Sequence, residues 1–88
     1  MSAYRTRVAR RAEKQLDRLP DPQRARVEKA VDRLEGWPQV RLDVRPLSGE
    51  WAGYLRVRVG EYRIVFRVDE AERTIWVVRI AARGGAYD

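Results

Sequence analysis

The chain has 88 residues, contains neither cysteine nor histidine, and carries a formal net charge of +6. We expect one domain over residues 1–88, with no disulfide and no thiolate chemistry, and without imidazole, the commonest general base and metal ligand. The acidic residues are scattered, so no metal site and no cofactor are expected. No apolar run is long enough to span a membrane or to serve as a signal-peptide core, which predicts a cytoplasmic protein.

Arginine dominates the basic residues, of which only Lys14 and Lys29 are lysines. The planar guanidinium group suits bidentate contacts to phosphate better than an ammonium group does. A basic composition is nevertheless weak support for a nucleic-acid partner, because GC-rich genomes also favour arginine. Whether the protein has a nucleic-acid partner therefore has to be judged from where the arginines lie in the fold.

The first half of the chain predicts a strand and two helices. Residues 4–8 alternate in polarity, which predicts a short strand with these inward-facing residues: Tyr4, Thr6 and Val8. Helical spacing follows at Ala12, Leu16 and Leu19, and Pro20 should end that helix.

A second helix should begin with Asp21 as its N-cap and Pro22 as its first residue. Its apolar stripe consists of Val27, Ala30, Val31 and Leu34. Gly36 is expected at the C′ position, where glycine commonly ends a helix. Because the link between the two helices is so short, they should form an antiparallel hairpin.

The second half predicts three strands after an irregular region at residues 37–53. Residues 54–59, 62–68 and 74–82 are rich in β-branched and aromatic side chains. Gly60 and Glu61 fit a two-residue type II′ turn. The resulting order, β-α-α-β-β-β, predicts an α+β domain in which the helical hairpin packs on a small, mainly antiparallel, twisted sheet.

The turn at Gly60 and Glu61 fixes the register of the hairpin. It places Val59 opposite Tyr62, and Arg58 opposite Arg63. Side chains alternate between the two faces of a sheet. One face should therefore be apolar and covered by the helices; its members are Leu55, Val57, Val59, Tyr62, Ile64 and Phe66, joined from the last strand by Trp76, Val78 and Ile80.

The opposite face should collect these residues: Tyr54, Arg56, Arg58, Arg63, Arg67, Arg79 and Arg83. Like charges directly opposite each other cost on the order of 0.2–1 kcal/mol. An ordinary solvated face would carry mixed signs, so the pattern favours an anion-binding site. Tyr87 lies beyond Gly84 and Gly85, which permit the chain to bend back over the sheet, although a tyrosine in this place can also be a simple exposed aromatic.

Three segments carry a resemblance to a known family. They are Leu47-Ser48-Gly49, residues 54–66 with the sequence YLRVRVGEYRIVF, and Ile80-Ala81-Ala82-Arg83 together with Tyr87. With the first helices they resemble the RelE/ParE toxin superfamily of type II toxin–antitoxin systems, over nearly the whole chain, and RelE-type messenger-RNA endoribonucleases most of all.

The resemblance implies a metal-independent endoribonuclease that cuts mRNA by attack of the ribose 2′-hydroxyl on the adjacent phosphate, usually in the ribosomal A site. The implied catalytic residues are Arg58, Arg63, Arg83 and Tyr87. Arg56 is implied to bind RNA, and the shared face adds Arg67, Arg79 and Tyr54. Guanidinium groups would stabilise the charge of the pentacoordinate phosphate, Arg83 would assist the leaving 5′-oxygen, and Tyr87 would stack on or position a base.

Position 58 departs from the RelE-type pattern. It resembles a lysine proposed there as the general base, and an arginine holds its proton too tightly for that role. Tyr87 or a ribosomal group could take the role, with Arg58 stabilising charge alone. Two alternatives stay open: a ParE-like toxin that poisons DNA gyrase without nuclease activity, and an inactive member kept for antitoxin binding and operator control.

The resemblance also implies partners. They are a cognate antitoxin with an acidic or amphipathic segment, mRNA with the ribosome, and operator DNA that the toxin–antitoxin complex binds through the antitoxin. No membrane partner is expected.

Overall fold

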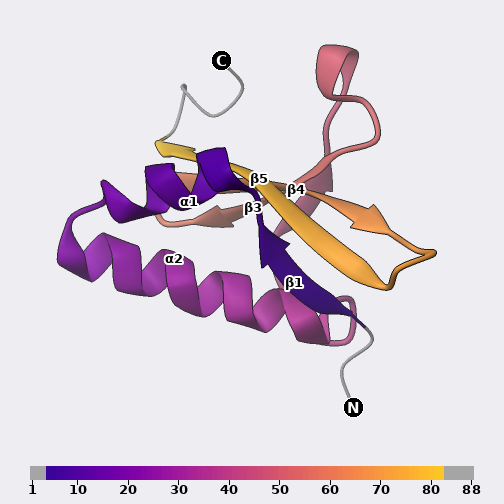
Figure 1. Ribbon diagram of the computed structural model, residues 1–88, viewed down its shortest axis with the longest axis horizontal. Coiled ribbons are helices and arrows are strands. Elements are labelled where there is room, and N and C mark those ends of the chain that lie inside the picture. Colours follow the sequence, from indigo (N-terminus) through magenta and orange to yellow (C-terminus); the bar gives the residue numbers. More distant parts are fainter. Residues whose placement is uncertain (1–3, 83–88) are drawn as a thin grey trace.

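A computed structural model describes residues 4–82 of the chain, which form two α-helices, two short 3-10 helices and one five-stranded sheet (Figure 1). In chain order the elements are β1 (Arg5–Val8), α1 (Arg10–Asp17), α2 (Asp21–Arg33), η1 (Leu34–Gly36), β2 (Val44–Pro46), η2 (Gly49–Trp51), β3 (Leu55–Val59), β4 (Tyr62–Asp69) and β5 (Thr74–Ala82). None of the helices within residues 4–82 has the length and apolar character needed to cross a membrane.

The sheet has the strand order β1-β5-β4-β3-β2, in which β1 is parallel to β5 and every other neighbouring pair is antiparallel. The predicted α+β class is therefore confirmed. The sequence did not predict β2, because this strand has only three residues, one of them Pro46, within a region without regular alternation. Its brevity and its proline suit an edge strand, since both discourage further pairing.

The hairpin of β3 and β4 has the predicted register. Val59 pairs with Tyr62, and Arg58 pairs with Arg63. Gly60 has a φ of +60°, whereas Glu61 has no positive φ. This combination fits the type II′ turn and excludes type I′, which needs positive φ at both central residues. The turn thus sets which side chains of both strands share a face.

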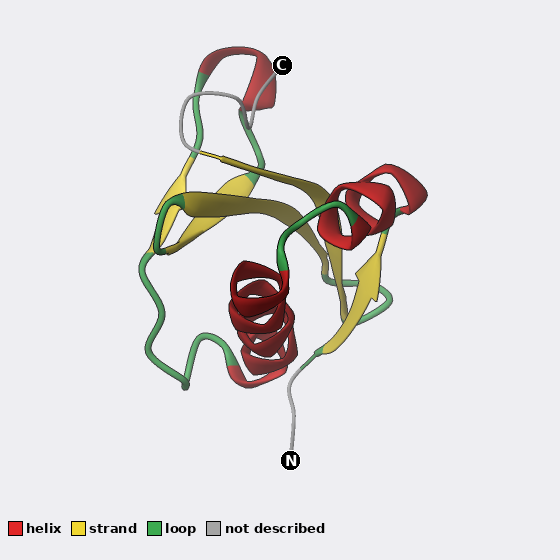
Figure 2. Cartoon of the chain, turned by 90° about the vertical axis from the view of Figure 1, so that its left-hand side faces the viewer, coloured by secondary structure: helices red, strands yellow, loops and turns green. Residues whose placement is uncertain are grey.

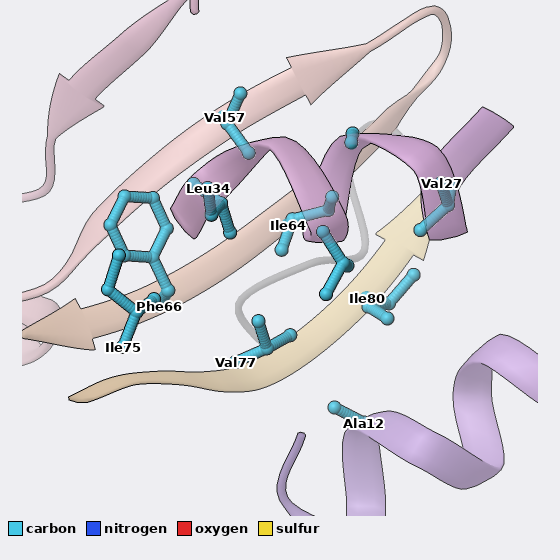
Figure 3. Close-up of a cluster of buried hydrophobic side chains, with 11 residues drawn as sticks. Ala12, Val27, Leu34, Val57, Ile64, Phe66, Ile75, Val77 and Ile80 are labelled. Carbon is cyan, nitrogen blue, oxygen red and sulfur yellow. The ribbon is translucent and has the colours of Figure 1, made fainter. Parts of the chain in front are cut away.

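The core lies between α2 and the sheet, which arches over this helix (Figure 2). Leu34, Ile64 and Phe66 are fully buried there, and Ala12 of α1 belongs to the same cluster (Figure 3). The two helices run in opposite directions (Figure 1), as the short link between them predicted. The helices cover the predicted apolar face of β3 and β4.

Both ends of α2 differ from the prediction in detail. Pro20, not Asp21, is the N-cap, so Asp21 takes the first helical position and its carboxylate pairs with Arg24 at 2.7 Å. Gly36 does not have a positive φ and closes η1 in place of a C′ cap. It is required for space, because a Cβ there would lie 2.4 Å from Cγ2 of Val40.

The prediction for β5 was wrong at two positions. A register shift between Val65 and Phe66 makes Val65 pair with Arg79 and Phe66 with Val77, so that Val78 has no direct partner. Such a bulge reverses the alternation of faces along a strand. As a result Ile75 and Val77 enter the core in place of Trp76 and Val78, and only Ile80 keeps its predicted position.

Helix α1 lies along the part of β5 that β1 leaves unpaired. β1 ends opposite Val77, and Ala9 N–H donates to the carbonyl of Val77 at 2.8 Å. Further along this edge, the backbone N–H of Ile80 donates to Oε1 of Gln15 at 2.8 Å. A side chain of α1 thus replaces a missing strand partner.

Candidate nucleic-acid interface

The sheet face turned away from α2 carries most of the candidate residues, and we call it the open face. Its side chains form three rows that run across the strands. The first row consists of Arg58, Arg63 and Ala81. Arg58 N–H points away from β4 and donates to the carbonyl of Asp43, so Arg58 and Arg63 form a non-hydrogen-bonded pair with Cα atoms about 4.5 Å apart. The predicted juxtaposition of these arginines is present.

The second row consists of Arg45, Arg56, Val65 and Arg79. The side chain of Arg56 is only 13 % exposed, and its Nη1 lies 3.7 Å from Oδ2 of Asp43 and 3.3 Å from the carbonyl oxygen of the same residue. Asp43 also lies 3.8 Å from Arg45. This carboxylate was not among the predicted site residues; it comes from the irregular region before β2. Arg56 is therefore held by Asp43, which partly compensates its charge and is shared with Arg45.

An aromatic pair stands over the end of the second row. The rings of Trp51 and Tyr54 meet edge to face with centroids 5.0 Å apart, and Cζ of Arg79 lies 5.4 Å from the Trp51 ring centre. Nη1 of Arg79 donates to the carbonyl of Val78 at 2.8 Å, while its buried Nε has no hydrogen-bond partner in the described part of the chain. The predicted Tyr54 and Arg79 thus lie together, with Trp51 added by η2.

The third row consists of Arg7, Trp76 and Arg67. Trp76 is half-buried, and Cζ of Arg67 lies 5.9 Å from the centre of its ring. Beside this row is a hollow lined by Arg5, Arg7, Glu72, Thr74 and Trp76. The bulge in β5 brings this tryptophan to the open face.

The guanidinium groups of the open face are poorly compensated. Within residues 4–82, no carboxylate forms an ion pair with any of these arginines: Arg5, Arg7, Arg58, Arg63, Arg67 and Arg79. Adjacent like charges raise the free energy of the free protein. A polyanion that lies across the rows relieves this repulsion, which is the electrostatic property expected of a nucleic-acid-binding surface.

A comparison with protein families identifies the family of this chain. The family model of the ParE toxin of type II toxin–antitoxin systems, parDE, matches residues 6–87. The chain belongs to the ParE toxin family. It is thus a toxin of the RelE/ParE superfamily, as its sequence motifs indicated. A search of curated proteins finds no match.

Solved structures agree with this assignment. The toxin is 30 % identical to a chain of the toxin–antitoxin complex RelBE2 from Mycobacterium tuberculosis, with 94 % of each chain covered and a TM-score of 0.82. It is 29 % identical to a chain of the archaeal RelE–RelB complex from Pyrococcus horikoshii, with 96 % of this chain and 99 % of that chain covered and a TM-score of 0.76. The isolated RelE toxin from E. coli shares the fold at 17 % identity and a TM-score of 0.74, with 96 % and 88 % covered.

Of the residues that the sequence singled out, those on described strands of the toxin lie on the open face. Arg58 is exposed, Arg63, Arg67 and Arg79 are half-buried, and Arg56 is engaged by Asp43. Arg83 and Tyr87 lie outside the described residues. The structure adds further members that were not predicted as site residues: Arg5, Arg7, Arg45, Trp51 and Trp76.

The signal for Arg5 and Arg7 was present, because both alternate with the inward-facing residues of β1. The sequence did not predict that β1 lies beside β5. No sequence signal marked Trp76, since a regular strand would have buried it.

Proposed function

We propose that the toxin is a messenger-RNA endoribonuclease that uses the open face to bind a single strand and to stabilise the cleavage transition state. The observation that carries the proposal is the in-register pair of Arg58 and Arg63, which forms no ion pair with any described carboxylate. Arg58 is exposed and Arg63 is half-buried. A pentacoordinate phosphate gathers negative charge during transfer, and preorganised guanidinium groups bind that charge more strongly than they bind the ground state.

The reaction that we propose needs only the substrate's own nucleophile. The ribose 2′-oxygen attacks the adjacent phosphorus, its proton passes to a base, the bond to the 5′-oxygen breaks, and that oxygen takes up a proton. The products are a 2′,3′-cyclic phosphate and a 5′-hydroxyl. Arg63 and Arg58 neutralise the phosphate oxygens, Arg83 assists the leaving oxygen, and the base is Tyr87 or a ribosomal group, because Arg58 keeps its proton.

The proposal includes the partners. The relatives from Mycobacterium tuberculosis and Pyrococcus horikoshii are both toxin–antitoxin complexes, which supports a cognate antitoxin for this toxin. We propose that an acidic segment of this antitoxin covers the arginine rows, and that the resulting complex binds operator DNA through the antitoxin. The target, mRNA on translating ribosomes, places the activity in the cytoplasm.

The test uses translating ribosomes with a defined mRNA, read by primer extension and end-group analysis. We expect cleavage without added divalent metal beyond that needed by the ribosome, with a 2′,3′-cyclic or 3′-phosphate end and no cleavage where deoxyribose replaces the ribose. Arg63→Gln should lower the cleavage rate about 10²- to 10³-fold. Arg18→Gln, which removes an exposed arginine at the end of α1, is the matched control and should cleave normally. Cleavage of the deoxy-substituted message would refute the mechanism.

A second candidate function, poisoning of DNA gyrase, is favoured by two observations. The family model that matches the chain is that of the ParE toxin. Position 58 holds arginine, where RelE-type members are expected to hold lysine. The same preparation distinguishes the candidates. Gyrase-dependent DNA breaks together with intact mRNA would establish the second function, and neither activity would indicate a member kept for antitoxin binding alone.

A further inference from the structure

The third row of the open face combines an aromatic ring with two cations on β1, β5 and β4, at the β1 edge of the sheet. Trp76 is bracketed by its direct strand partners, Arg7 on β1 and Arg67 on β4. The ring is half-buried, and no residue in the described range 4–82 accepts a hydrogen bond from its indole N–H. Cζ of Arg67 lies 5.9 Å from the ring centre, a cation–π distance. A half-buried ring flanked by two cations is well suited to a ligand that is both flat and anionic.

The fold places the ring there by an irregularity. A regular β5 would send Trp76 into the core, and the bulge at Val78 reverses the alternation. Bulges are common next to functional sites, where they redirect a side chain. The hollow beside the ring is bordered by two cations, Arg5 and Arg7, and by Glu72 and Thr74. The Thr74 hydroxyl donates to the carbonyl of Glu72, so a ligand on the ring meets the two arginines on one side and a single carboxylate on the other.

The distance from the first row matches an extended ligand. Arg63 and Arg67 are four residues apart on β4, which corresponds to about 13 Å along the strand. A short stretch of single-stranded nucleic acid bridges such a distance. Aromatic platforms within a basic groove are the usual way in which proteins hold successive bases of a single strand.

We propose that Trp76 forms a second nucleotide subsite of the toxin, in which the indole stacks on a base of single-stranded RNA while Arg7 and Arg67 contact the neighbouring phosphates. This inference rests on the proposed function, because it concerns RNA bound to the same face. The subsite lies away from the reacting phosphate, so it determines affinity and the length of strand that the toxin engages. Trp76 is a binding residue and takes no part in the cleavage step.

The experiment measures binding of a fluorescein-labelled, 2′-O-methyl oligonucleotide of about ten residues, which cannot be cleaved by attack of a 2′-hydroxyl. Trp76→Leu keeps an apolar side chain but removes the aromatic face, and we expect about 5- to 150-fold weaker binding. Trp76→Phe retains an aromatic face and should keep most of the affinity. Circular dichroism and urea unfolding verify that each variant is folded, and Arg18→Gln should bind like the wild type.

A series of oligonucleotides with one abasic residue identifies the contact. One abasic position should weaken binding to the wild-type toxin and have no further effect on Trp76→Leu, because both changes remove the same stacking interaction. Equal affinity of Trp76→Leu and wild type overturns the subsite while RNA binding by the open face stands. Binding of the wild type to no oligonucleotide, even at low salt, overturns the subsite and RNA binding by the open face together.

Discussion

The pair of Arg58 and Arg63 shows at single-residue scale how the proposed binding surface opposes stability. Their Cα atoms lie about 4.5 Å apart, and neither has an ion-pair partner within residues 4–82. In the free toxin this arrangement stores repulsion, which is released when an anion binds. This repulsion is small, but it lowers the stability of the free toxin, whereas an arginine with a structural role would raise it.

Arg63→Gln should therefore stabilise the free toxin by about 0.2–1 kcal/mol, although it removes a proposed catalytic group. The measurement is the urea concentration at the midpoint of unfolding, which should rise. Arg18→Gln, on the helical layer, should change the free energy of unfolding by less than about 0.5 kcal/mol. A lower midpoint for Arg63→Gln would show that this arginine has a structural role instead.

Tyr4 provides a pH-dependent test of the packing at the start of β1. Its hydroxyl donates to Oε2 of Glu70 at 2.8 Å, and Cζ of Arg73 lies 4.4 Å from the ring centre. The hydrogen bond to Glu70, followed by desolvation and the negative charge of Glu70, raises the pKa of Tyr4 above its usual value, while Arg73 opposes the shift.

The difference between the ultraviolet titrations of the wild type and of Tyr4→Phe should reveal a tyrosine that ionises above the usual pKa of about 10. Glu70→Gln should lower that pKa again. Because the pKa is raised in the folded state, the contribution of Tyr4 to stability is complete below the unfolded pKa and is lost as the pH rises through the folded pKa. A Tyr4 that titrates at the ordinary value in the wild type would contradict the hydrogen bond.

At the scale of secondary-structure elements, α1 stabilises β5 through one side chain. The N–H of Ile80, a residue only 2 % exposed, has Oε1 of Gln15 as its acceptor. Gln15→Leu should lower the free energy of unfolding by about 1–3 kcal/mol, since the buried donor is left without a partner. Gln15→Glu keeps an acceptor and should lose less. Urea unfolding measures both variants, and equal losses would mean that packing rather than the hydrogen bond is responsible.

The elements also differ in how well the sequence predicted them. The register of β3 and β4 was predictable because Gly60 and Glu61 form a two-residue turn whose geometry leaves one pairing. The inward and outward faces of β5 were not predictable, because a bulge depends on how two strands fit together and is not evident in the composition of either strand. Val78 looks like any other strand residue, yet its missing partner moves Trp76 from the core to the open face.

The same distinction holds for the candidate site. Alternation along β3 and β4 identified Arg56, Arg58, Arg63 and Arg67, since these strands are adjacent in sequence. The sequence did not predict Arg7 and Asp43 as parts of the site, because their positions depend on contacts between distant segments. These contacts join β1 to β5, and the segment before β2 to β3. The sequence therefore predicted which residues face solvent better than it predicted which of them meet.

For the whole molecule, the arginine rows predict how RNA binding depends on salt. Each phosphate that a cation neutralises contributes about 0.7 to the slope of log K against log salt for a single strand. Arg63→Gln and Arg67→Gln should each make the slope less steep by about that amount. Arg56→Gln should change it less, because Asp43 already lies 3.7 Å from that arginine and its side chain is only 13 % exposed.

Fluorescence anisotropy over a series of salt concentrations provides these slopes, with Arg18→Gln as the variant that should leave the slope unchanged. Asp43→Asn should make the slope steeper, since it releases Arg56 for contact with RNA. Equal slopes for all arginine variants would mean that the bound strand does not follow the open face.

The position of β5 between β1 and β4 has a consequence for the time at which the toxin becomes active. β1 is made first of the described strands and β5 last, yet Arg7 and Trp76 are direct neighbours in the third row. A ribosome adds about 5–20 residues per second, so for several seconds β1 is outside the ribosome without its partner. No nascent chain that stops before β5 can complete the second or the third row, which take Arg79 and Trp76 from that strand. The ribosome that makes the toxin is consequently not exposed to a finished arginine surface until the residues of β5 have emerged.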